Sequence, residues 1–119
     1  MLYFLASDSK DPANGKPPTP EVIEQMGAFI VEGYTNGTLV STGAMDPRKK
    51  HIVSRGGQIT ITDGPFTEAK EAVVGWAIVR VDSEDQALEL SRRFYEIVGE
   101  GSGTIQRIYE NGEGIPGQS

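Results

Sequence analysis

The sequence predicts a single α+β domain in which two helices pack on one face of an antiparallel sheet. Two segments repeat apolar residues at three- and four-residue spacing, which is typical of helices with one buried stripe. Short runs rich in Val, Ile and Thr lie before, between and after them, and such runs are typical of strands. A chain of 119 residues is long enough to bury a core of its own without disulfide bonds.

The first strand and the first helix are predicted from residues 1–6 and from the segment after Thr19. Residues 1–6 are an apolar run, and the proline-rich residues 11–20 that follow predict a loop. Thr19 offers a capping hydroxyl, and Pro20 suits the first helical position. The helix has one apolar stripe, expected to be buried: Val22, Ile23, Met26, Phe29, Ile30 and Tyr34. It is expected to stop at Asn36-Gly37.

A short strand over residues 38–41 and a β-hairpin are expected next. Residues 51–54 and 58–62 are β-prone and flank Gly56-Gly57, which is a hairpin signal. The isoleucines of the second run alternate with threonines, so one face of the hairpin should be wet. We expect the hairpin to lie at a sheet edge or to project from it.

The run of residues 73–81 is apolar at both odd and even positions until Arg80, which predicts a central strand covered on both faces. Ser83 begins a second helix with acids in its first turn. A last strand is predicted over residues 102–109.

This order predicts a ferredoxin-like βαββαβ sandwich with an inserted β-hairpin, formed by residues 1–110, followed by a flexible tail at 111–119. Both helices lie on one face, so a second cover is needed. Two-fold dimers are the commonest oligomers, and we therefore expect a homodimer packed sheet to sheet as an α+β barrel.

Composition excludes several classes of function. The chain has no cysteine and one histidine, so we expect no metal site, no cofactor and a cytoplasmic location. The formal net charge is -6, and Lys and Arg are scattered apart from residues 48–50, which argues against a nucleic-acid partner. No segment has the length of a membrane span.

The candidate site is the stretch 63–71 that precedes the central strand. Asp63 is either a general base or ligand acceptor, or a residue that accepts hydrogen bonds from the amides of its own turn. The candidate ligand-binding residues are Pro65, Phe66, Glu68, Lys70 and Trp76. The two aromatic side chains of this set would form an apolar wall or belong to the core. Its Glu and Lys would neutralise a pocket or form a solvated cluster.

The sequence DGPFTEAKE at residues 63–71, with the preceding hairpin and the following Gly75-Trp76 strand, resembles the signature of the DGPF proteins within the YCII-related (YciI-like) family. The resemblance extends from Met1 to Tyr109 and implies a ferredoxin-like protomer that forms a dimeric α+β barrel. It also implies an enzyme-like function. In some bacteria, proteins of this family are encoded beside extracytoplasmic-function sigma factors or joined to them. The wider family pairs an Asp with a His near the first helix. That helix has no His here, and the sole histidine, His51, is in the hairpin.

Two functions follow as hypotheses. The first is a protein that binds a small apolar or aromatic molecule in the dimer cleft, with cofactor-free, isomerase- or lyase-like proton transfer through Asp63. The alternative is a non-catalytic binding or regulatory module linked to sigma-factor control of transcription.

Overall fold

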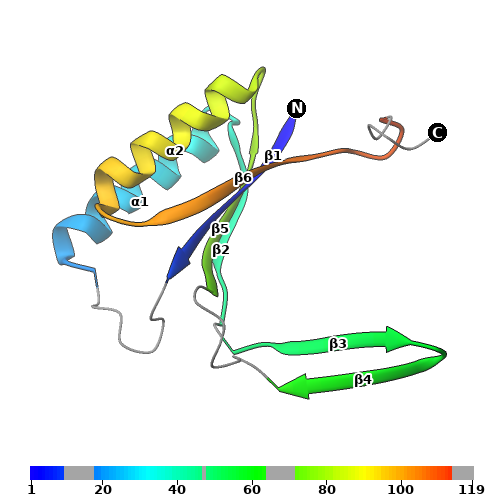
Figure 1. The fold of residues 1–119 in the computed structure, drawn as a ribbon. Helices are drawn as coiled ribbons and strands as arrows, with labels where there is room; N and C mark the ends of the chain where they lie inside the picture. Colours follow the sequence, from blue (N-terminus) through cyan, green and yellow to red (C-terminus); the bar gives the residue numbers. More distant parts are fainter. Residues whose placement is uncertain (10–17, 47, 64–71, 114–119) are drawn as a thin grey trace.

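The computed structural model describes residues 1–9, 18–46, 48–63 and 72–113. Four antiparallel strands form the main sheet in the order β2 (Leu39–Ala44), β5 (Ala72–Arg80), β1 (Leu2–Ser9) and β6 (Ser102–Ile108). Helices α1 (Pro20–Thr35) and α2 (Glu84–Val98) both lie on one face of this sheet (Figure 1). This is the strand order of a ferredoxin-like sandwich, so the predicted fold is confirmed.

The core lies where the middle of the sheet meets the start of α2. Its buried residues are Tyr3, Val79, Val81 and Ala87. Tyr3 and Val79 are cross-strand partners in the register of β1 and β5, so their side chains leave the sheet on the helix side together. The run predicted as a central strand therefore contributes Val79 and Val81 to this core, with Ala77 packed against them.

Both helices begin and end as their sequences predict. The Thr19 hydroxyl accepts a hydrogen bond of 3.3 Å from the Val22 amide, and the Ser83 hydroxyl accepts one of 3.2 Å from the Gln86 amide. Gly37 and Gly99 follow the two helices with φ of 80° and 88°, a left-handed backbone that glycine adopts without strain.

The predicted apolar stripe of α1 is only partly on its inner side. The side chains of Ile23 and Tyr34 are 58% and 49% exposed, and Val31 is 63% exposed. No residue of α1 is buried. The prediction was wrong for Ile23 and Tyr34, because the apolar arc of α1 is wider than the strip that faces the sheet. Residues such as Met26, Phe29 and Ile30 form that strip.

The inserted hairpin is a separate two-stranded sheet of β3 (Lys50–Arg55) and β4 (Gln58–Asp63). Gly56 and Gly57 form its turn with φ of 58° and 79°, as a two-residue turn of this kind requires. The hairpin projects away from the helices (Figure 1). It was expected to be wet on one face only, but Ile59 and Ile61 are 68% and 60% exposed, so both of its faces are open in the described structure.

Candidate functional site

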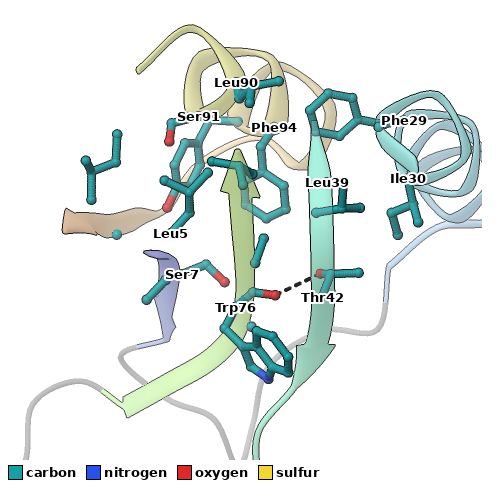
Figure 2. Close-up of a pocket in the computed structure, with 18 of the residues that line it drawn as sticks. Leu5, Ser7, Phe29, Ile30, Leu39, Thr42, Trp76, Leu90, Ser91 and Phe94 are labelled. Atoms are coloured by element: carbon teal, nitrogen blue, oxygen red, sulfur yellow. Dashed lines mark hydrogen bonds between the residues drawn. The ribbon is translucent and has the colours of Figure 1, made fainter. Parts of the chain in front are cut away.

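A cavity of about 510 Å³ separates the two helices from the sheet. Its walls come from both helices and from all four strands of the main sheet, and most of the lining is apolar. The larger apolar side chains are Leu5, Phe29, Ile30, Leu39, Leu90 and Phe94. Figure 2 shows these side chains gathered between α1, α2 and the strands. The cavity thus occupies the place where a fully packed sandwich would continue its core.

The cavity exists because small residues line the sheet beneath the helices. Gly43, Gly75, Ala77 and Gly103, from three different strands, all border it. Gly75, Ala77 and Gly103 offer little or no side chain to fill the layer between sheet and helices, and a glycine inside a strand often marks such an open place. The helices therefore rest on the large side chains around the cavity rather than on the sheet below it.

Trp76 borders the cavity from β5, and its side chain lies on the face of the sheet opposite the helices, with that of its register partner Ala6. Its indole ring crosses Gly43, where an added Cβ would lie 2.9 Å from Cζ2. The Thr42 hydroxyl donates a hydrogen bond of 2.8 Å to the Trp76 carbonyl, which holds β2 against β5 at this point (Figure 2). Gly43 is thus required for the position of the ring.

The polar groups of the lining are few, and they are hydroxyls: Ser7, Thr38, Thr42, Ser91, Tyr95 and Thr104. Among the described residues that line the cavity, none carries a charge. A site of this kind suits a neutral ligand with an apolar body, because it offers hydrogen bonds but no ion pair.

Tyr95 is the strongest hydrogen-bonding group of this set. Burial raises the pKa of its phenol, and the negative charge of Asp8 raises that pKa further. The phenol therefore stays protonated at neutral pH and can both donate and accept. An added Cβ at Gly103 would collide with the Tyr95 hydroxyl and with the Ala6 carbonyl, so glycine lets the ring lie against β6.

Asp63, the candidate general base, is the last residue of β4 and lies outside the cavity lining. Its carboxylate accepts a hydrogen bond of 2.7 Å from the Lys50 ammonium, its cross-strand partner at the base of the hairpin. The Asp63 side chain is 84% exposed. His51 lies on β3 opposite Thr62, also outside the lining. The structure thus places the candidate base and the sole histidine on the hairpin.

The remaining predicted site residues divide into two groups. Trp76 lines the cavity. Pro65, Phe66, Glu68 and Lys70 lie outside the described residues. The sequence analysis did not identify the hydroxyl groups of the cavity or the glycines that leave space for it. The one signal that could have found them is the isolated glycine in each of three strands, at positions 43, 75 and 103.

The described parts of the chain hold neither a metal-binding cluster nor a membrane-spanning helix. No cluster of three or more His, Asp or Glu residues there could hold a metal ion. None of the described helices has both the length and the apolar character needed to cross a membrane.

Comparison with known proteins identifies one family. The model of the YCII-related domain matches residues 1–109. None of the curated proteins matches the chain. Among solved structures, the chain is similar to the 5-chloro-2-hydroxyhydroquinone dehydrochlorinase TftG of Burkholderia phenoliruptrix AC1100, in complex with 2,5-dihydroxybenzoquinone. The identity is 12% and the TM-score 0.48, with 93% of this chain and 96% of the other covered.

Proposed function

The chain belongs to the YCII-related family, and we propose that its function is to bind a small apolar or aromatic molecule in the cavity between the helices and the sheet. The observation that carries this proposal is the cavity itself. Its volume of about 510 Å³ is within the range of about 300–1,000 Å³ typical of ligand pockets. A void of this size in an apolar core is costly if it stays empty, because its lining loses packing contacts.

The lining supports an aromatic ligand with a polar substituent. Phe29 and Phe94 offer ring surfaces, which pack against other flat apolar groups. The hydroxyls of Ser91 and Tyr95 lie on α2 among these apolar residues and can bind a hydroxyl or carbonyl of the ligand. The absence of a charged group from the described lining disfavours a carboxylate or phosphate ligand.

The activity to test is cofactor-free, isomerase- or lyase-like proton transfer with Asp63 as general base. Proton transfer needs a base within hydrogen-bond reach of the substrate, directly or through one water. The ion pair of Asp63 with Lys50 and its exposure favour a structural role for this carboxylate at the base of the hairpin. That observation favours the second candidate, a non-catalytic binding or regulatory module, in which the ligand is sensed and not converted.

We also propose that a second copy of the chain covers the face of the main sheet opposite the helices. The side chains on that face alternate with those of the core, and beside polar ones such as Arg80 and Gln106 they include five large apolar side chains: Leu2, Phe4, Trp76, Ile78 and Ile108. No described part of the chain lies over them (Figure 1). A two-fold dimer would bury this face against its own copy.

A cavity-filling variant tests the binding proposal. Ser91→Met extends an unbranched apolar side chain into the cavity, and Ser91→Ala is the matched control that keeps the space but loses the hydroxyl. In a thermal-shift screen with neutral aromatic compounds, a true ligand should raise the Tm of the wild type and of Ser91→Ala, but not that of Ser91→Met. A ligand at about one hundred times its Kd stabilises the fold by about 2.7 kcal/mol, which such a screen detects readily.

An assay for conversion of each ligand that the screen finds separates the two candidate functions. If Asp63→Asn binds a ligand normally but fails to convert it, the carboxylate is the general base of an enzyme. If the ligand is bound by both proteins and converted by neither, the binding module is favoured. Ligands that stabilise Ser91→Met as much as the wild type would contradict the cavity as the site.

A further inference from the structure

We propose that the β3–β4 hairpin is a docking arm whose isoleucine face packs on a second copy of this chain. The proposal rests on the dimer proposed above but goes beyond contact between the two sheets. It assigns a partner to a segment that the chain itself leaves uncovered, and it does not depend on what the cavity binds.

The apolar face of the arm follows from the strand register. Ile52 pairs with Ile61, and Ser54 pairs with Ile59, so the three isoleucines lie on one face together with the Lys50–Asp63 pair. These isoleucines are 65%, 60% and 68% exposed. The opposite face carries His51, Val53, Arg55, Gln58, Thr60 and Thr62. The arm is therefore amphipathic, with its exposed apolar surface concentrated on one side.

A two-stranded arm of this kind needs a cover. Isolated hairpins are marginally stable in water, and strands gain stability when one face packs against another layer. Three adjacent isoleucines, each more than half exposed, are a patch that marks an interaction surface rather than scattered exposed residues. Because β3 and β4 form a sheet of their own, no strand of the main sheet supplies that layer.

The position of the arm indicates a second copy as the partner. The hairpin extends to the side of the main sheet that faces away from α1 and α2 (Figure 1). Phe4 and Ile78 lie on that same, uncovered side of the sheet. A copy seated on the open sheet face would therefore come within reach of the arm, and by two-fold symmetry its own arm would reach back.

Charge favours the same partner. The hairpin, residues 50–63, contains two basic residues, Lys50 and Arg55, and a single acid, Asp63, which gives the arm a formal charge of +1. The whole chain carries -6, so the rest of the chain carries -7. A basic arm on an acidic body attracts the body of another copy, and this attraction orients the encounter.

The test compares two variants of the arm. Ile52→Thr combined with Ile61→Thr keeps β-branched side chains, and hence the hairpin, but removes the apolar pair. Val53→Thr makes one such change on the opposite face and is the control. In sedimentation equilibrium of the full chain, the double variant should raise the dimer Kd at least about tenfold. A tenfold change corresponds to about 1.4 kcal/mol, which is less than the burial of one isoleucine side chain contributes. The control should stay within about twofold of the wild type.

The outcomes are distinguishable. A double variant that dimerises like the wild type would overturn the arm proposal and leave the sheet-to-sheet dimer intact. A wild type that is monomeric at micromolar concentration would overturn both the arm proposal and the sheet-to-sheet dimer. Ligand binding in the cavity is tested independently, by the thermal-shift screen. A basic arm also suits nucleic acid, so a short DNA duplex is titrated at low salt. Binding of the duplex by the wild type would overturn the second copy as the partner.

Discussion

At the scale of single residues, the chemistry of the cavity depends most on the Tyr95 hydroxyl. Ser7, Ser91 and Thr104 are weaker and less acidic donors, and the cavity lining that the structure describes has no ionisable side chain other than this phenol. Its pKa is raised by burial and then by the charge of Asp8. Ionisation of Tyr95 therefore costs more in the folded chain than in the unfolded one, and this difference can be measured.

We predict that Tyr95→Phe flattens the alkaline loss of stability. An unfolded tyrosine has a pKa of about 10, and the pKa of folded Tyr95 is higher. Below pH 10 both states are protonated, and the contribution to stability is fully present. Above about pH 10 the unfolded state loses its proton first, so stability falls as the pH rises through the folded pKa. Urea unfolding between pH 8 and 11 should show a steeper fall for the wild type than for Tyr95→Phe.

The control for this prediction is Tyr34→Phe, which removes a hydroxyl from an exposed ring on α1. At pH 8 it should leave the free energy of unfolding close to that of the wild type. Parallel curves for Tyr95→Phe and the wild type above pH 10 would show that the environment of Tyr95 does not differ between the folded and unfolded states.

At the scale of elements, α1 depends on α2 for its position over the cavity. Arg93 of α2 donates a hydrogen bond of 2.7 Å to Glu32 of α1, and its guanidinium lies 4.9 Å from the centre of the Phe29 ring. The hydrogen bond from Arg93 to Glu32 raises the pKa of the guanidinium, which stays charged in any case. A single side chain thus connects the two helices above the ligand space.

We predict that Arg93→Ala lowers the free energy of unfolding by about 1 kcal/mol, since an exposed ion pair and an exposed cation–π contact each contribute about 0.2–1 kcal/mol. Arg92→Ala is the matched control, because Arg92 pairs only with Glu89 of its own helix among the contacts described. It should cost no more than about 0.5 kcal/mol. Equal effects of the two substitutions in urea unfolding would contradict a connecting role for Arg93.

The same scale shows what could be predicted from the sequence. Thr19, Ser83 and the Gly56-Gly57 turn act through local hydrogen bonds and backbone angles, which the neighbouring residues determine. The exposure of Ile23 and Tyr34 could not be predicted in this way. Apolar spacing identifies a helix but not which part of a wide apolar arc meets the sheet, because the tilt of α1 depends on α2 and on the strands beneath it.

The candidate site also has features that the sequence predicted and features that only the folded structure shows. Trp76 was found because it lies in an unmistakable strand run beside the 63–71 stretch. The cavity was not found, because a void arises where small residues from several strands meet, and that meeting is a property of the sheet order. Asp63 was singled out from its turn-like surroundings, and its pairing with Lys50 depends on the hairpin register, which sequence spacing alone leaves open.

At the scale of the whole molecule, the main feature of a single chain is that no second layer of described residues covers the face of the main sheet opposite the helices (Figure 1). Phe4 of β1 and Ile78 of β5 are cross-strand partners on this face, and each is only partly buried. Because neither residue belongs to the core on the other face, a substitution here should change assembly more than folding. This separation allows the dimer to be tested without unfolding the protomer.

We predict that Ile78→Glu gives a folded monomer, because a carboxylate at the centre of a sheet-to-sheet interface would be buried without a partner. Gln106→Glu adds the same charge on the same face, at the exposed edge strand β6, and should weaken the dimer far less. Light scattering gives the mass, and the Tm of a dimer, unlike that of a monomer, rises with protein concentration. An Ile78→Glu protein with the mass of a dimer would show that the open sheet face is not the interface. The exposed isoleucines of the arm would then need another partner, because the copy proposed to cover them would no longer lie beside the hairpin.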